Sequence, residues 1–293
     1  MFESKYNEYL SAYTQYAEQY CQNLVTEPAI LGESMKYSLL GGGKRIRPVL
    51  LLATADVLNV PIKDVLPYAL ALEMIHTYSL IHDDLPAMDN DDFRRGKPSN
   101  HKVYGEGNAI LAGDGLLNTA FSLCLEQCIR GEQFILASKY LAECAGINGM
   151  IAGQSADLLF TAEKSETELT EENLWFIYER KTGKLLLAPV AIACILSNNN
   201  NYFEFEKFGK YLGMLFQITD DILDETSSLS ALGKSVGKDK EADKFTSVRL
   251  YGLDGANIRA DLCAQNCHAV LDGIDGDVSF LHELIKYVRE REK

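Results

Sequence analysis

The chain has 293 residues, of which 47% are hydrophobic and 24% charged, the balance of a globular protein with a substantial core. Its 28 Lys and Arg residues against 42 Asp and Glu residues give a net charge of -14. Because nucleic-acid backbones and anionic lipids bind basic surfaces, this acidity argues against a nucleic-acid partner or a charge-held membrane protein. A local basic cluster can still hold an anionic substrate.

The N-terminal end and the cysteines are consistent with a cytoplasmic protein. Residues 1–20 mix charged and polar side chains without an apolar run, so we expect no signal peptide. No stretch reaches the roughly 18 apolar residues of a membrane-spanning helix. The seven cysteines include no Cys-x-x-Cys pair, and we expect them to be buried apolar residues in a reducing compartment.

The predicted elements are all helices. Residues 66–82, for example, are rich in helix formers and too numerous for a strand. No set of alternating apolar and polar runs with hairpin turns predicts a sheet. In chain order, the predicted helices cover residues 2–24, 28–40, 47–58, 66–82, 108–129, 133–159, 171–196, 203–225, 256–271 and 279–292. We therefore expect one all-α domain over residues 1–293, a bundle of about ten helices around a deep central cavity.

A glycine turn followed by three cations separates the second and third predicted helices. It reads Gly41-Gly42-Gly43-Lys44-Arg45-Ile46-Arg47-Pro48. Exposed backbone N–H groups, the positive end of a helix and guanidinium groups together suit phosphate. The run lacks the Gly-Lys-Ser/Thr ending of a P-loop, and an ordinary capped helix start is the alternative.

The fourth predicted helix ends in the acidic cluster Asp83-Asp84-Leu85-Pro86-Ala87-Met88-Asp89. Pro86 should end or kink the helix, so that the chain can fold Asp89 back toward Asp83. Carboxylate oxygens suit a hard cation such as Mg²⁺, which usually completes its coordination with water and substrate phosphate.

Three basic or polar residues flank this cluster. His76 lies seven residues before Asp83, two turns along nearly the same line of the helix. Arg94 and Arg95 follow the cluster, where they could bind phosphate oxygens that a metal leaves free. Taken alone, the histidine could be a core residue and the arginines a surface pair.

A second acidic cluster, Asp220-Asp221-Ile222-Leu223-Asp224, ends the helix predicted for residues 203–225. On a helix, Gln217, Asp220, Asp221 and Asp224 share a stripe about 100° wide. Three carboxylates on one stripe repel each other unless a cation or water separates them.

Two solvated acidic patches are the alternative to a metal site. Two such clusters, each ending a long apolar helix, favour the metal site. An EF-hand is disfavoured because residues 89–92 lack the mid-loop glycine and the closing glutamate at the required spacing. Metal sites and cations together point to polyphosphate, and the remaining apolar helix faces point to a hydrocarbon. The sequence thus predicts a ligand in which a diphosphate is attached to a hydrocarbon.

In these motifs the chain resembles the short-chain trans-polyprenyl diphosphate synthases, and among them the bacterial-type farnesyl diphosphate synthases. The resemblance extends from about residue 41 to residue 244, with weaker similarity in the flanks. It rests on motifs that occur in the expected order: both acidic clusters, the Gly-Gly-Lys-Arg-Ile-Arg-Pro run, Ser79-Leu80-Ile81-His82 before the first cluster, Gly153-Gln154-Ser155-Ala156-Asp157-Leu158 and Lys181-Thr182-Gly183.

The resemblance implies roles for individual residues. The Mg²⁺ sites, with three ions per active site, would be formed by Asp83, Asp84, Asp89, Asp220, Asp221 and Asp224, with Asp84 as a supporting neighbour. The isopentenyl diphosphate pocket would contain Lys44, Arg47, His76 and Arg95. The allylic diphosphate contacts would be Arg94, Lys181 and Lys234. The catalytic residues would be Lys181, with Thr182 and Gln217, whose oxygens would face the developing allylic cation.

The same resemblance implies an isoprenoid synthase-like fold, a homodimer and a head-to-tail condensation. Mg²⁺ and cationic side chains would help the allylic diphosphate, dimethylallyl and then geranyl, to ionise. The double bond of isopentenyl diphosphate would attack the allylic cation, and the released diphosphate would take the final proton. The products would be farnesyl diphosphate and diphosphate.

Product length is predicted from Tyr78. This residue lies five positions before Asp83, about 7.5 Å along the helix, where its ring would form the floor of the cavity beneath the metal site. The family associates such an aromatic, with the insertion Pro86-Ala87, with a fifteen-carbon product. Geranylgeranyl diphosphate synthase and a non-catalytic partner subunit of a prenyl synthase remain alternatives. A terpene cyclase would not need the second diphosphate pocket, and a metal-buffering or scaffold protein would not consume isopentenyl diphosphate.

Two segments depart from the family pattern or give little guidance. After Lys244 the family usually continues to Thr-Tyr-Pro, whereas this chain reads Phe245-Thr246-Ser247-Val248-Arg249, which leaves the role of Lys244 and the closure of this loop open. The last residues, 289–293, could help to cover a diphosphate, although a solvated tail is the preferred interpretation.

Overall fold

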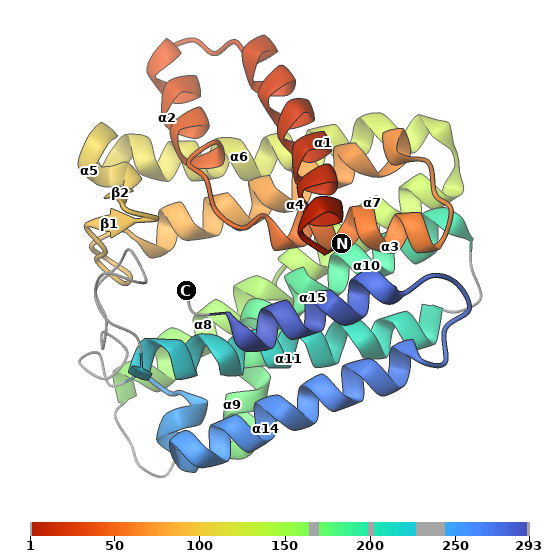
Figure 1. The fold of residues 1–293 in the computed structure, drawn as a ribbon. Helices are drawn as coiled ribbons and strands as arrows, with labels where there is room; N and C mark the ends of the chain where they lie inside the picture. Colours follow the sequence, from red (N-terminus) through yellow and green to blue (C-terminus); the bar gives the residue numbers. More distant parts are fainter. Residues whose placement is uncertain (1, 164–169, 199–201, 227–243, 292–293) are drawn as a thin grey trace.

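The computed structural model describes residues 2–163, 170–198, 202–226 and 244–291. Within these ranges nearly every element is a helix, which confirms the predicted all-α class (Figure 1). The first half of the chain forms α1 (Phe2–Asn23), α2 (Ala29–Leu39), α3 (Ile46–Val57), α4 (Ile62–Asp83), α5 (Asn100–Tyr104), α6 (Glu106–Gln127), α7 (Glu132–Ala145) and α8 (Met150–Glu163). The second half forms α9 (Glu171–Ile177), α10 (Lys184–Ser197), α11 (Tyr202–Thr226), α14 (Ser247–Leu271) and α15 (Ser279–Glu290).

Short irregular elements connect these helices. A 3-10 turn spans Cys128–Arg130, and a π-helical segment, Tyr178–Gly183, joins α9 directly to α10. The strands β1 (Phe93–Arg94) and β2 (Lys97–Pro98) pair antiparallel. Sequence patterns did not predict this hairpin. Its two-residue turn, Arg95-Gly96, has positive φ at both positions, a backbone that glycine favours at the second position and that matches the twist of a tight hairpin.

Two predicted helices differ most from the structure in their bounds. The helix predicted for residues 133–159 divides into α7 and α8, because the backbone turns between Gly146 and Gly149. A Cβ at Gly149 would lie 2.1 Å from the carbonyl oxygen of Cys144, so only glycine fits this turn. Helix α14 begins at Ser247, earlier than predicted, and contains a break at Gly252, where φ is +70°.

Helices α4 and α10 occupy the centre of the bundle. Every residue of α10 from Leu185 to Cys194 is buried, and most residues of α4 are buried as well. A helix that is apolar on all sides cannot lie on the surface, so the other helices pack around this pair. Helix α4 packs against α3 and α6, and α10 packs against α3, α7 and α11.

The fold brings the two acidic clusters to the same end of the bundle. Asp83 is the last residue of α4, and Asp220 to Asp224 lie in the last turns of α11. Both helix ends, with the β-hairpin, lie on the left of Figure 1. Among the described residues, no helix is long and apolar enough to cross a membrane.

Candidate active site

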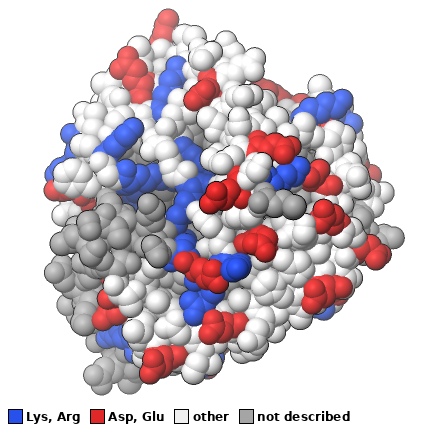
Figure 2. All heavy atoms as spheres, in the orientation of Figure 1, with Lys and Arg blue, Asp and Glu red and all other residues white. Residues whose placement is uncertain are grey.

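A cavity of about 370 Å³ opens beside the two acidic helix ends. The residues that line it include a group of cationic and imidazole side chains from four parts of the chain: Lys44, Arg45, Arg47, His76, Arg94, Arg95 and Arg291. Glu73, Thr182, Phe216 and Asp220 also line this cavity. Figure 2 shows Lys and Arg side chains gathered in a hollow on this face, with Asp and Glu beside them. An acidic chain thus contains one strongly basic pocket, which suits an anionic ligand.

The glycine turn builds one wall of this pocket. Gly42 and Gly43 have φ of +86° and +110°, and the chain enters α3 through Arg45, whose φ of +52° is also left-handed. A Cβ at Gly43 would lie 2.8 Å from the guanidinium carbon of Arg95. The glycines therefore allow the hairpin arginine to lie directly on the turn, and the Nη1 of Arg95 donates to the carbonyl of Gly42 at 2.5 Å.

The electrostatics of the pocket favour an anion. Burial lowers the pKa of Arg47 to about 10, although nearby carboxylates oppose the shift, and its Nε is buried without a hydrogen-bond partner. Burial, together with Arg47 and Arg95, holds the pKa of His76 well below its usual range. His76 is therefore neutral at pH 7. The buried Nε–H of Arg47 needs an acceptor, which a diphosphate oxygen can provide.

The first acidic cluster folds as its proline predicts. After α4 ends, the backbone N–H of Asp89 donates to the carbonyl of Asp83 at 2.8 Å, so the chain returns over the helix end. Asp83 accepts a hydrogen bond from the side-chain amide of Gln154 on α8. Burial raises the pKa of Asp83 to about 6, while Lys181 opposes that shift. The Asp89 carboxylate lies 3.3 Å from the Nζ of Lys244.

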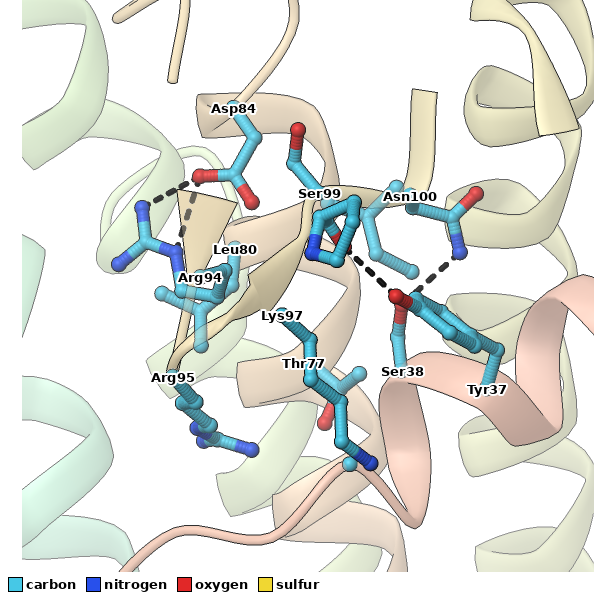
Figure 3. A pocket seen from close by; sticks show the side chains of 13 residues that line it. Tyr37, Ser38, Thr77, Leu80, Asp84, Arg94, Arg95, Lys97, Ser99 and Asn100 are labelled. Atoms are coloured by element: carbon cyan, nitrogen blue, oxygen red, sulfur yellow. Dashed lines mark hydrogen bonds and ion pairs between the residues drawn. The ribbon is translucent and has the colours of Figure 1, made fainter. Parts of the chain in front are cut away.

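Asp84 pairs with Arg94. Its side chain is 3% exposed, and its Oδ1 accepts hydrogen bonds from Arg94 Nε and Nη2 at 2.9 and 2.5 Å. This ion pair borders a second, smaller hollow that is also lined by Thr77 and Asn100 (Figure 3). The Asp84–Arg94 pair anchors the hairpin to the end of α4.

In the second cluster, Asp220 faces the pocket and Asp221 faces the protein interior. The Asp220 side chain is 45% exposed, and its Oδ1 lies 2.7 Å from the Nη2 of Arg291. Asp221 is 4% exposed and accepts hydrogen bonds from the Tyr178 hydroxyl, from Gln217 Nε2 at 3.1 Å and from Ser247 N and Oγ at 2.7 and 2.8 Å. Burial raises the pKa of Asp221 to about 6, although these hydrogen bonds oppose the shift.

Residues 245–249, where the chain departs from the family pattern, include a contact to Asp221. Ser247 is the first residue of α14, and both its backbone N–H and its hydroxyl donate to Asp221. Thr246 caps α14 by accepting a hydrogen bond from the N–H of Arg249. The divergent residues therefore tie the start of α14 to α11. Asp224, the third carboxylate of the cluster, is 7% exposed.

The residues expected to be catalytic lie between the two clusters. The π-helical segment carries Lys181, whose Nζ pairs with Asp157 at 2.5 Å. Asp157 and Asp83 raise the pKa of Lys181 despite its burial, so this side chain stays cationic. Thr182 Oγ1 donates to Gln217 Oε1 at 2.6 Å, and Thr182 also lines the pocket.

Most sequence-predicted site residues therefore lie at one end of the bundle. Lys234 lies outside the described residues. Tyr78 is 6% exposed, and burial raises its pKa to about 12. Its ring centroid lies 5.7 Å from that of His82, one turn closer to Asp83.

Sequence reasoning missed three pocket residues. Glu73 and Arg45 lie within the helix and the glycine run already singled out, but nothing in the pattern separates them from their neighbours. Arg291 was expected in a solvated tail. Its side chain is 4% exposed, packs over the ring of Phe216 with the guanidinium carbon 3.9 Å from the ring centre, and donates to the Phe216 carbonyl.

The donor set fits Mg²⁺. The carboxylate oxygens of Asp83 at the end of α4, of Asp89 just after it and of Asp220 near the end of α11 are all hard ligands. Among the residues that the structure describes, no three Asp, Glu, His or Cys side chains meet closely enough to hold a metal ion. Mg²⁺ is commonly bound by only a few carboxylates, and water and phosphate are its other ligands.

Comparisons with known proteins agree with this geometry. Residues 28–270 match the family model described as polyprenyl synthetase. The chain is 42% identical to the farnesyl diphosphate synthase of Bacillus subtilis over 270 residues, 90% of each chain. It is 44% identical to the chloroplastic geranylgeranyl pyrophosphate synthase of Capsicum annuum over 257 residues, 86% of this chain and 69% of the other.

Solved structures give the same result. A geranyltransferase from Legionella pneumophila superposes with a TM-score of 0.86 at 33% identity, covering 99% of this chain and 98% of that one. A geranyltransferase from Helicobacter pylori, complexed with magnesium and isoprenyl diphosphate, superposes with a TM-score of 0.82 at 32% identity, covering 97% and 96%.

Proposed function

The chain belongs to the polyprenyl synthetase family and is a trans-prenyltransferase, and we propose that it makes farnesyl diphosphate. In this reaction isopentenyl diphosphate condenses head-to-tail with dimethylallyl and then with geranyl diphosphate. The observation that carries the proposal is one cation-lined cavity of about 370 Å³ beside two acidic helix ends. A single site can then hold one diphosphate by cations and a second by carboxylates and metal.

The basic pocket is the proposed isopentenyl diphosphate site. Lys44, Arg47, His76 and Arg95 all line it, and Arg47 offers a buried Nε without a protein acceptor. In either protonation state His76 has a ring N–H that can donate a hydrogen bond to the diphosphate. Arg291 lies in the same cavity, and we add it to the proposed diphosphate contacts.

The acidic clusters are the proposed Mg²⁺ site for the allylic diphosphate. Asp83, Asp89 and Asp220 would be ligands, with Asp84, Asp221 and Asp224 supporting them, and three ions are proposed per active site. When bound, Mg²⁺ supplies charge that neutralises the leaving diphosphate. Lys181, which remains cationic beside Asp157, would hold the same group, and so would Arg94 and Lys234.

The side chains between the clusters would support the developing cation. Thr182 and Gln217 are joined by a hydrogen bond, so the threonine hydroxyl proton is directed away from the pocket and its oxygen lone pairs are available to an allylic cation. Preorganised charge and positioning supply most of the catalysis, because the protein has to stabilise charge rather than form covalent bonds. The released diphosphate would accept the final proton.

The fifteen-carbon product is proposed because of Tyr78. Farnesyl and geranylgeranyl diphosphate synthases are both relatives at similar identity, so identity alone does not select the product. The buried ring of Tyr78, one turn behind His82, lies five residues before Asp83. It would block a chain growing along α4.

A homodimer is also proposed. Helix α6 exposes Leu111 and Leu125 at 56% and 65%, and their spacing of fourteen residues places them near one side of the helix. The exposed residues between them on this face are Asp114, Asn118 and Ser122, and such a mixed apolar and polar surface can form an interface with a second copy of the chain. Light scattering of the purified protein would give twice the monomer mass, whereas a monomer would contradict this assembly.

The test is incubation of the purified protein with Mg²⁺, isopentenyl diphosphate and either dimethylallyl or geranyl diphosphate. We expect farnesyl diphosphate from both primers and no turnover with EDTA. Tyr78→Ala should extend the products beyond fifteen carbons, as read by chromatography. A twenty-carbon wild-type product would favour the geranylgeranyl alternative, and no product from any primer would favour a non-catalytic subunit.

A further inference from the structure

We propose that Glu73, which resemblance to the family did not single out, is a positioning residue for the arginines of the diphosphate pocket. This inference deepens the proposed function, since it concerns the pocket assigned to isopentenyl diphosphate. Glu73 lies in α4 one turn before His76, lines the cavity and is 1% exposed. A buried carboxylate in an anion pocket is unusual, because its charge opposes that of the ligand.

The first arginine that Glu73 holds is Arg45. The Nη1 of Arg45 lies 2.5 Å from Glu73 Oε1, and both side chains are almost fully buried. The Nη2 of the same guanidinium donates to the carbonyl of Leu39 at 2.5 Å. Arg45 is thus fixed at two points, one on α4 and one at the end of α2, immediately before the glycine turn.

The second arginine is Arg95, which reaches the same carboxylate from the β-hairpin. Its Nη2 lies 3.9 Å from Glu73 Oε1, while its Nη1 donates to the carbonyl of Gly42. The guanidinium also lies directly against Gly43. One oxygen of Glu73 therefore attracts two arginines that are fifty residues apart in the chain.

Charge explains why the pocket needs this carboxylate. Arg45, Arg47 and Arg95 line one cavity, and without a ligand their like charges repel each other at short range. Burial lowers the pKa of Arg47, and among the nearby carboxylates Glu73 opposes this shift most strongly. The geometry thus gives Glu73 the task of holding the cations in place before the diphosphate arrives, which lowers the ordering cost of binding.

Two explanations of Glu73 predict opposite results for Glu73→Gln. If its negative charge only opposes the ligand, the neutral variant should bind diphosphates more tightly. If it positions Arg45 and Arg95, the variant should bind them more weakly, by about tenfold, which is the scale of one lost charge-assisted hydrogen bond. The measurement is calorimetric titration of the full-length protein with isopentenyl diphosphate and, separately, with inorganic diphosphate.

Kinetics separate positioning from a general loss of structure. We expect Glu73→Gln to raise the KM for isopentenyl diphosphate by about tenfold and to leave the KM for the allylic primer nearly unchanged. Equal changes in both KM values, or tighter binding, would overturn the proposal. Glu143→Gln, an exposed substitution on α7, is the matched control and should change neither KM.

A second variant keeps the test decisive if Glu73→Gln does not fold. Arg45→Met removes one of the two arginines that Glu73 holds and should weaken binding of inorganic diphosphate in the same direction, whereas unchanged binding would contradict the proposal. Failure of the proposed function would look different. In that case the wild-type chain would form no prenyl product, yet its affinity for inorganic diphosphate, and the effect of Glu73 on it, could still be measured.

Discussion

The two acidic clusters look alike in sequence but are built differently. Each begins with an Asp-Asp pair whose second aspartate is almost fully buried, Asp84 at 2% and Asp221 at 4% exposure. Asp84 is neutralised by one arginine of the adjoining hairpin, whereas Asp221 is surrounded by neutral donors from the π-helical segment, α11 and α14. The buried aspartate of the first cluster therefore has a partner nearby in sequence, whereas that of the second has partners from distant parts of the chain.

This difference shows that one acidic motif can combine two tasks. Asp83 and Asp220 carry carboxylates that can reach a metal, and their immediate neighbours hold the surrounding backbone. Removing the first aspartate of either pair should damage chemistry, and removing the second should damage the fold. The four predictions below test this division, from the largest expected effect to the smallest.

The largest effect should come from Asp83→Ala and Asp220→Ala. Each change removes a proposed ligand of the cation that neutralises the leaving diphosphate, so we expect kcat to fall by about a thousandfold or more. Gln154 loses its acceptor in the first variant and Arg291 its ion-pair partner in the second, so thermal unfolding is measured on both variants to separate a loss of chemistry from a loss of fold. Asp254→Ala, an exposed substitution on α14, should leave kcat unchanged. Full activity of either ligand variant would show that the cluster concerned takes no part in catalysis.

Asp221→Ala should instead lower the free energy of unfolding. The change leaves the Tyr178 hydroxyl, the Gln217 amide and the Ser247 hydroxyl without their acceptor, while the Ser247 N–H keeps only the Tyr178 oxygen. Buried donors that lose their partners cost about 2–4 kcal/mol in total. Urea unfolding of this variant beside Asp220→Ala measures the difference. Equal free energies of unfolding for the two variants would show that the hydrogen bonds to Asp221 do not stabilise the fold.

The arginines that pair with the two clusters should also differ in how much they stabilise the protein. Arg94→Met leaves Asp84 buried and unpaired, since the carboxylate is only 3% exposed, and should destabilise the protein by about 2–3 kcal/mol. Arg291→Met removes the partner of Asp220, whose side chain is already 45% exposed to water. We expect the free energy of unfolding to fall by less than about 1 kcal/mol. The free energies of unfolding of the two variants test this order, which the reverse ranking would contradict.

The smallest effect concerns pH in the metal-free protein. The pKa values of Asp83 and Asp221 are each raised to about 6 by burial, so between pH 6 and 4 the folded state binds more protons than the unfolded state. These two groups therefore add stability as the pH falls from 7, by about 1–2 kcal/mol each.

Replacement by asparagine should remove this gain. With EDTA present, urea unfolding at pH 7.5 and 5.5 should show a smaller gain on acidification for Asp83→Asn and Asp221→Asn than for the wild type. Mg²⁺ should abolish the contribution of Asp83 and leave that of Asp221. If Mg²⁺ changed both contributions equally, the proposed division between the two aspartates would be wrong.

Much of the fold and site could be predicted from local patterns. The 3.6-residue periodicity and the absence of alternating runs indicated an all-α chain, and Pro86 indicated the return of Asp89 over Asp83, which the backbone hydrogen bond confirms. The β-hairpin was missed because two strands of two residues carry no periodicity. Arg291 was missed because nothing near it in sequence indicates that it packs on Phe216, 75 residues earlier.

By itself, the sequence determined the helices, their acidic ends and the basic glycine turn, since each depends on residues within a few turns of chain. Only the tertiary structure decided that Asp220 faces the pocket while Asp221 is enclosed, and that Glu73 holds two distant arginines. Those roles depend on burial and on partners from other helices. The low dielectric of the packed interior makes such partners decisive, because there an unpaired charge or donor costs far more than it does in water.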